Sequence, residues 1–180
     1  MRRWCLVFFL AIASSTFSQR TSFDSLELAL ENKESAQSLQ LIGKDSDAIP
    51  ESIGELTNLY SLYIVDCPIT TLPQSISKLK NLTELYLVKL PNVVFPDSIG
   101  SLRLKALSLQ HNNLETVPLF VSKLAAVKDL DLRDNNLSTL PDFVFAIPHL
   151  KGLWLQGNNF SEEEKKRIRL ALPECWIKFE

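Results

Sequence analysis

Residues 124–146 read LAAVKDLDLRDNNLSTLPDFVFA, and this stretch decides the fold. It contains the pattern V-x-x-L-x-L-x-x-N-x-L, whose members are Val127, Leu130, Leu132, Asn135 and Leu137. Two leucines that alternate with polar residues predict a short strand with one buried face. The asparagine lies where the chain would turn away from that strand. Its side-chain amide is suited to pair with backbone groups in a turn that has no regular ladder.

The same unit recurs along the chain at a nearly constant spacing. The central leucine returns in steps of 23, 23, 22, 23 and 23, at Leu39, Leu62, Leu85, Leu107, Leu130 and Leu153. A proline returns in steps of 23, 23, 22 and 23, at Pro50, Pro73, Pro96, Pro118 and Pro141. Both series contain the step of 22, because only Arg103 separates Leu102 from Leu104. A fixed period of this size predicts stacked units that share one core.

With this motif and period the chain resembles the leucine-rich repeat family in its short LPxxIxxL form, and it is similar to bacterial secreted and plant Ras-group-related members. The resemblance covers residues 36–160, as one degenerate and five full units. It implies an α/β fold, a right-handed leucine-rich repeat solenoid with a parallel β-sheet on its concave face. It also implies protein recognition, with no cofactor and no attached catalytic domain.

Both flanks of the repeats are expected to cap the stack, because an uncovered end would expose leucines and unpaired strand groups. In residues 19–35 we expect a short helix with Asp24 as its N-cap and Glu27 three residues further on. In residues 161–180 Ser161 and Glu164 form a capping box that begins a second helix. Its predicted apolar stripe is Ile168, Leu170, Ala171 and Leu172. A final edge strand is expected over residues 175–179, after Pro173 ends the helix.

The first 18 residues have the pattern of a secretory signal peptide. Arg2 and Arg3 precede an apolar run over residues 4–13, and a small polar stretch ends at Ser18, where we expect cleavage. A retained N-terminal anchor is the alternative, although the run is short for a membrane span. The expected location is therefore secreted, periplasmic or at the cell surface, with no membrane span after cleavage.

The asparagine position of each unit varies along the chain. The third, fourth and fifth full units have Asn112, Asn135 and Asn158, whereas the first has Cys67 and the second has Leu90. We interpret Cys67 as a small buried side chain in the same row. Around Leu90 we expect a local change of register.

A disulfide is not expected after removal of the leader. Cys67 and Cys175 belong to units that are about 20 Å apart if strands are spaced about 4.8 Å, and a disulfide needs Cα atoms within about 7 Å. The chain has a formal net charge of -2, so a nucleic-acid partner is not expected, since that requires a clustered basic face.

Residues that alternate with the buried leucines should face the concave side in files along the sheet. We predict a ligand-binding surface there, composed of Tyr63, Val65, Tyr86, Val88, Ser108, Gln110, His111, Asp131, Arg133, Trp154 and Gln156. Aromatic and arginine side chains dominate protein interfaces, so a protein ligand is favoured over a glycan. The alternatives are that the aromatic residues only stabilise the sheet by cross-strand stacking, and that the charged residues form a solvated face.

Two other classes of function are the alternatives. A structural or self-associating solenoid would use its edges or its convex side instead of the concave face. A hydrolase would need His111, Ser108 and Asp134 to act together, and an open sheet offers them no evident oxyanion hole. Two scattered histidines without ligand spacing predict no metal site.

Overall fold

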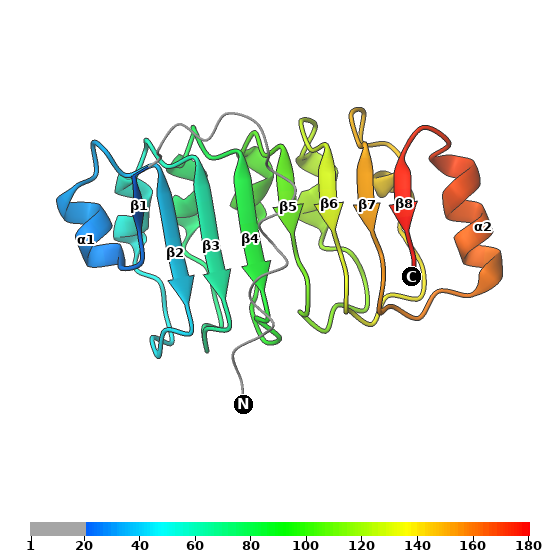
Figure 1. Ribbon diagram of the computed structural model, residues 1–180, viewed down its shortest axis with the longest axis horizontal. Coiled ribbons are helices and arrows are strands. Elements are labelled where there is room, and N and C mark those ends of the chain that lie inside the picture. Colours follow the sequence, from blue (N-terminus) through cyan, green and yellow to red (C-terminus); the bar gives the residue numbers. More distant parts are fainter. Residues whose placement is uncertain (1–20) are drawn as a thin grey trace.

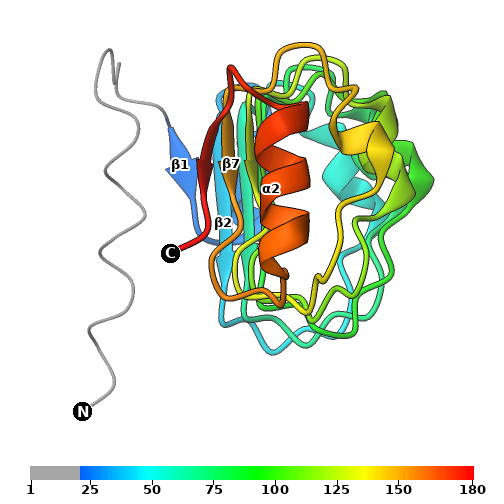
Figure 2. The same ribbon diagram turned by 90° about the vertical axis from the view of Figure 1, so that its right-hand side faces the viewer.

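The computed structural model describes residues 21–180, which form a solenoid with two layers. One layer is a sheet of eight parallel strands whose order follows the sequence, and the other contains five short 3-10 helices (Figures 1 and 2). The strands are β1 (Ser22–Phe23), β2 (Ser38–Ile42), β3 (Ser61–Val65), β4 (Glu84–Val88), β5 (Ala106–Ser108), β6 (Asp129–Asp131), β7 (Gly152–Trp154) and β8 (Trp176–Lys178). The predicted solenoid and its parallel sheet are confirmed. The expected signal peptide lies outside the described residues.

The repeat period sets the register of the sheet. The central leucines pair with one another across neighbouring strands from Leu39 to Leu153, and each is at most 1% exposed. The next inward leucine or isoleucine, such as Ile64 or Leu132, is fully buried as well. One unit cannot bury these side chains alone, so the stack supplies the core.

The missing residue in the third full unit does not interrupt the stack, because Leu85 on β4 still pairs with Leu107 on β5. The backbone absorbs the deletion at Leu102, where ψ is 155°, compared with 55° at the equivalent Leu56 and 66° at Leu79. An extended residue covers more distance than a bent one. The shorter loop therefore reaches the same strand position.

The recurring prolines begin the second layer. Each 3-10 helix follows one of them, in η1 (Glu51–Glu55), η2 (Gln74–Lys78), η3 (Asp97–Ser101), η4 (Leu119–Lys123) and η5 (Asp142–Val144). Proline suits this place because its φ is fixed near -65° and its missing N–H group needs no partner there. One apolar residue of each helix, for example Ile76, is fully buried against the strand leucines.

The asparagine row forms hydrogen bonds between consecutive units. Asn135 Oδ1 accepts from the backbone N–H groups of Asn112 and Leu114, at 3.0 Å each, and Asn135 Nδ2 donates to the carbonyls of Leu109 and Leu132. In the first full unit Cys67 occupies this position, is buried, and lies 3.4 Å from the carbonyl of Leu41 through its Sγ. The predicted structural role of the row is confirmed.

The second full unit changes register as predicted. Leu90 is buried in the asparagine row, and Asn92, at the usual apolar position, is exposed. Val93 packs against the core one residue later. Cys67 and Cys175 are both free thiols, as expected.

Helices close both ends of the stack, α1 (Leu26–Glu31) and α2 (Glu162–Ala171) (Figure 1). The N-cap of α1 is Ser25, whose Oγ accepts from Leu28 N–H, so the prediction of Asp24 was wrong by one residue. The edge of β2 is covered by β1, which the sequence did not predict.

At the other end Ser161 is the N-cap as predicted, since its Oγ accepts from Glu164 N–H at 3.2 Å. The capping box is confirmed only in this half, because the Glu164 carboxylate accepts from Leu140 N–H and from Arg167 instead of Ser161 N–H. The predicted apolar stripe was wrong in part. Ile168 and Leu172 are buried, whereas Leu170 is 73% exposed and Ala171 is exposed. Leu170 lies two residues from both buried side chains, and residues two apart on a helix do not share a face. The expected edge strand is β8, which pairs with β7.

Candidate functional site

The side of the sheet that is turned away from the 3-10 helices contains the predicted binding residues, and we call it the strand face. Tyr63 and Tyr86 pair across β3 and β4, and Asp131 pairs with Ser108 on one side and Trp154 on the other. The predicted files along the strand face are therefore correct in register. Whether they bind a ligand stays a prediction.

The first half of the strand face is aromatic and apolar. The rings of Tyr63 and Tyr86 are stacked, with their centroids 4.4 Å apart and their planes within 1° of parallel. Both side chains are partly buried, and burial together with Tyr63 raises the pKa of Tyr86. Val65 and Val88 pair beside them. Val65 is partly buried and Val88 is buried, so the expectation that Val88 is open to solvent was wrong.

The middle of the strand face is less accessible than expected. Ser108, Gln110 and Asp131 are all buried, with Ser108 only 1% exposed, which corrects the prediction that they lie open. Ser108 has a short side chain between the longer side chains of Tyr86 and Asp131 on strands about 4.8 Å away. Larger neighbours screen a small side chain even when its Cβ points outward.

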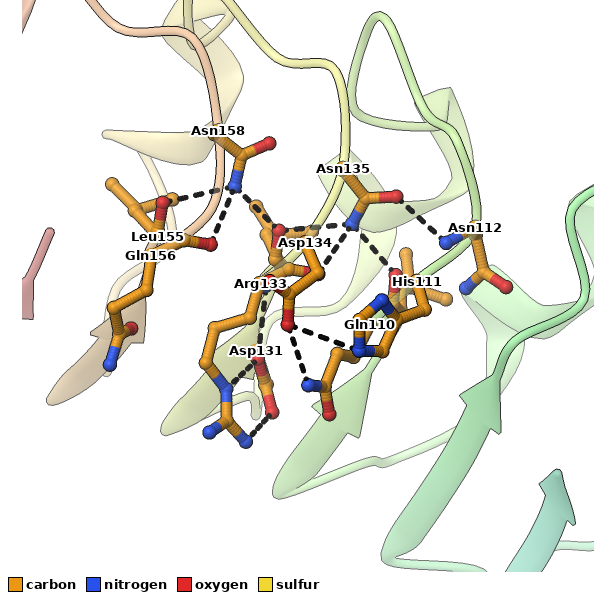
Figure 3. A network of polar contacts seen from close by, with 12 residues as sticks. Gln110, His111, Asn112, Asp131, Arg133, Asp134, Asn135, Leu155, Gln156 and Asn158 are labelled. Carbon is orange, nitrogen blue, oxygen red and sulfur yellow. Dashed lines mark hydrogen bonds and ion pairs between the residues drawn. The ribbon is translucent and has the colours of Figure 1, made fainter. Parts of the chain in front are cut away.

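Two polar clusters lie next to this region (Figure 3). In the first, Arg133 holds Asp131 with two side-chain hydrogen bonds, of 2.9 Å from Nε and 2.6 Å from Nη2. This bidentate geometry raises the pKa of Arg133, chiefly through the hydrogen bonds to Asp131. The pair also explains why Asp131 is buried, since the guanidinium of Arg133 supplies the donors that water would otherwise provide.

The second cluster is centred on one carboxylate oxygen (Figure 3). Asp134 Oδ2 lies 2.9 Å from Gln110 Nε2 and 3.2 Å from His111 Nε2. Gln110 is thereby fixed against the next unit, whereas His111 remains exposed. His111 and Asp134 therefore lie side by side at neighbouring strand exits.

A backbone feature of this row was not found from the sequence. The residues at the strand exits all have positive φ, between 54° and 69°, at Gly43, Asp66, Lys89, His111, Asp134 and Gly157. Positive φ is the left-handed region, which glycine enters without strain and aspartate enters more easily than most residues. The two glycines and two aspartates in the row were the available signal. Lys89 obscures this signal, because lysine has no such preference.

The last part of the strand face is aromatic again. Trp154 on β7 and Trp176 on β8 are in edge contact, with ring centroids 5.3 Å apart and planes at 63°. Trp154 is partly buried and Trp176 is 54% exposed. Trp176 was not predicted as a site residue because it lies beyond the last repeat, where the period of 23 residues no longer predicts which side chains lie on the strand face. Gln156, two residues after Trp154, is partly buried as well.

The residues weighed for hydrolysis do not assemble into a relay. His111 Nε2 faces Asp134, while within residues 21–180 Ser108 Oγ has no hydrogen-bond partner. Over the same range, no three His, Cys, Asp or Glu side chains are grouped so that they could hold a metal ion. Nor does this part of the chain contain a helix that is long and apolar enough to cross a membrane.

A family model described as leucine rich repeat matches residues 100–160. Among solved structures, a leucine-rich repeat protein of Leptospira interrogans matches with 22% sequence identity and a TM-score of 0.38, over 87% of this chain. The match spans 57% of the length of the Leptospira protein. No curated protein sequence matches this chain.

Proposed function

We propose that this leucine-rich repeat protein binds a protein partner through the strand face of its sheet. The fold is a scaffold that typically binds proteins, because stacked units create an extended surface of side chains on a rigid backbone. The contact would be centred on the Tyr63 and Tyr86 pair, which is the single observation that supports this surface most strongly.

The stacked tyrosines have the properties of an interface anchor. Their rings hold each other in one orientation, so little side-chain entropy remains to be lost when a partner binds. Tyrosine also offers a large apolar surface and a hydroxyl group in one side chain, which is why it is frequent among binding hot spots. Val65 extends the apolar surface next to the rings.

The polar clusters are suited to select the partner. The Asp131 and Arg133 pair and the exposed His111 lie next to the aromatic half, toward the C-terminal end of the strand face. Charged groups at the side of an apolar anchor contribute more to specificity and association rate than to affinity. A partner surface with an apolar centre and a polar margin on one side would match this arrangement.

The test is capture of a partner from the surface fraction of the producing cell by wild type and by Tyr63→Ser/Tyr86→Ser. We expect the double variant to lose capture while its melting temperature changes little, because both tyrosines are only partly buried. The matched control is Leu119→Ser, which removes an exposed apolar side chain from η4 on the opposite layer. Equal capture by wild type and the double variant would contradict the proposed surface.

We also propose that the protein acts outside the cytoplasm, in the periplasm, at the cell surface or after secretion. The support is the basic and apolar pattern of residues 1–18. Cell fractionation with mass spectrometry of the N-terminus tests it. A mature chain that begins after Ser18 and is found outside the cytoplasm is expected, and an uncleaved cytoplasmic chain contradicts the proposal.

The alternative function, self-association through the ends of the solenoid, has one supporting observation. Each capping helix exposes a leucine, Leu28 on α1 at 48% and Leu170 on α2 at 73%. Sedimentation at rising concentration separates the two functions. Dimers or longer assemblies that Leu170→Glu abolishes would favour self-association, and a monomer at all concentrations would exclude it.

A further inference from the structure

We propose that the C-terminal end of the strand face contains a notch that receives an arginine side chain of the protein partner. The notch is formed by Asp129, Trp154 and Trp176. It deepens the proposed function by naming a chemical group of the partner, and it rests on that function only in assuming that the strand face meets a protein.

The proposed notch depends on the glycine in the middle of three neighbouring strands. Asp129 on β6 pairs with Gly152 on β7, and Gly152 pairs with Trp176 on β8. The outer two positions are therefore two strand spacings apart, about 9–10 Å between Cα atoms. Gly152 has no side chain to fill the gap between them.

The indole of Trp154 lies in this gap as a floor. A Cβ atom on Gly152 would lie 2.6 Å from Cη2 and 2.8 Å from Cζ3 of Trp154, and 2.8 Å from Oδ1 of Asp129. The six-membered ring of Trp154 therefore covers Gly152 and reaches the carboxylate of Asp129. Trp176 forms a wall at 63° to this floor, and Asp129 lies on the opposite side.

The carboxylate of Asp129 has no direct partner for its charge among the described residues. It is partly buried, and within residues 21–180 it has neither an ion pair nor a hydrogen bond. Burial raises its pKa, and the nearby Lys128 and Lys151 oppose this only through their charges at a distance. Lys178, on β8 at the register position of Trp154, is exposed on the far side of the notch.

These properties fit a guanidinium group better than other groups. A planar cation can stack on the indole face, where the ring quadrupole attracts positive charge. Its N–H groups can at the same time donate to a carboxylate in a fork geometry that an ammonium group does not have. Lys178 disfavours a cation on its own side, so the guanidinium would lie toward Asp129.

A titration of the full chain with the peptide N-acetyl-Gly-Arg-Gly-amide tests the notch. The signals of the indole N–H groups of Trp154 and Trp176 are followed by NMR and assigned with Trp→Phe variants. We expect both signals to shift and saturate at millimolar peptide. The same peptide with citrulline, which has the shape of arginine without its charge, should bind at least about fivefold more weakly.

The variant Asp129→Asn keeps the side-chain shape and removes the charge, and we expect it also to weaken arginine binding at least about fivefold. Asp66→Asn is the matched control, because Asp66 is an exposed carboxylate at the exit of β3, and it should leave binding unchanged. Unchanged melting temperatures establish that both variants fold. Absent shifts, equal binding of the citrulline peptide or an unaffected Asp129→Asn variant would each overturn the proposal.

Failure of the notch is distinguishable from failure of the proposed function. The peptide titration needs no natural partner, and Tyr63→Ser/Tyr86→Ser should bind the arginine peptide as wild type does. Arginine binding without partner capture would contradict the tyrosine surface alone. Partner capture without arginine binding would contradict the notch alone.

Discussion

In the second half of the solenoid the asparagine row contains Asn112, Asn135 and Asn158, whereas in the first half the same row contains Lys44, Cys67 and Leu90. The strands differ in the same way. Strands β2, β3 and β4 each have five residues, and β5, β6 and β7 each have three. The two halves thus have one period and one core but different side chains in the asparagine row.

The difference shows that the repeat can be closed by two kinds of interaction. Where asparagine is present, its amide pairs with backbone groups of its own unit and of the preceding one. Where cysteine or leucine is present, the side chain is buried without such an amide. The backbone hydrogen bonds at the strand exits are the same in both halves, for example from Asp66 N–H to the carbonyl of Val88 and from Asp134 N–H to that of Gln156. The first half therefore depends more on apolar packing, and the second half more on buried hydrogen bonds.

The largest expected effect is that of Asn135→Ala. It leaves two N–H groups, one of them only partly buried, and two buried carbonyls without the amide. Each unpaired buried group costs about 1–3 kcal/mol, so we expect a loss of at least about 4 kcal/mol in the free energy of unfolding. Cys67→Ala is the counterpart in the first half and should cost only about 1 kcal/mol. Urea unfolding of both variants measures the difference. Equal losses would remove the distinction between the halves.

Glu164, in the C-terminal helix, tests how far the second half depends on hydrogen bonds. Its carboxylate accepts from Leu140 N–H at 2.9 Å and from Arg167 Nε at 2.7 Å, and the hydrogen bonds with Arg167 are the main cause of its lowered pKa. We expect Glu164→Gln to cost about 2 kcal/mol at pH 7. Glu162→Gln, at an exposed position in the same turn, should cost almost nothing.

The effect of Glu164 should depend on pH with a definite sign. A carboxyl group whose pKa is lower in the folded state stabilises the fold at pH values above its unfolded pKa, about 4.3. This contribution disappears as the pH falls through the lowered folded value. The gap in stability between wild type and Glu164→Gln should therefore be full at neutral pH and narrow below about pH 4. A gap that is constant from neutral to acidic pH would contradict the role of the ionised carboxylate.

A smaller effect is expected for Gly152→Ala, which fills the space under the Trp154 ring. The added methyl group would meet the ring and Asp129 Oδ1 at less than 3 Å, so the indole has to move. Because Trp154 is only partly buried, we expect a loss of about 1 kcal/mol and a changed near-UV circular dichroism signal. Gly43→Ala is the control in the first half. It strains a backbone with φ of 59°, but among residues 21–180 no atom lies within 4 Å of the new methyl group, so the tryptophan signal should be unchanged.

The smallest effect, and the only gain, is expected for Lys89→Gly. Lys89 has φ of 56°, and its ion pair with Asp66 is exposed and 3.7 Å long, so little is lost with the side chain. Relief of the left-handed backbone outweighs the greater freedom of glycine in the unfolded chain, with a net gain of about 0.5 kcal/mol. The control Lys105→Gly, at an exposed position outside the positive-φ row, should be destabilising. A loss at both positions would contradict the strain at the strand exits.

Sequence reasoning predicted the interior well because the interior is periodic. The position of each strand leucine follows from the alternation of two residues and from the step of 23, and the register of Leu39 through Leu153 agrees with it. The predictions for the capping helices failed where a shift of one residue along the helix changed the result. Asp24 and Ser25 are both good N-caps, and only the backbone geometry of Ser25 shows which residue begins α1.

The candidate site was predicted in position but not in accessibility. The strand positions of Tyr63, Tyr86 and Trp154 follow from the register of the repeats. Ser108 and Gln110 are nevertheless buried, because the repeat pattern does not contain the size and hydrogen bonds of their neighbours. The contribution of Trp176 was missed because the sequence after Asn159 no longer follows the repeat. The domain boundaries and the binding role of these residues stay predictions.

The sequence alone determined the period, the stacked parallel strands and the inward side chains, because each depends on local alternation and on a spacing that can be counted. The tertiary structure decided what the strand face offers to a partner. Accessibility, the hydrogen bond from Gln110 to Asp134 and the contact of Trp154 with Trp176 depend on side chains from different units. Such contacts are set by the size and charge of neighbours more than 20 residues apart in the chain, which no local pattern records.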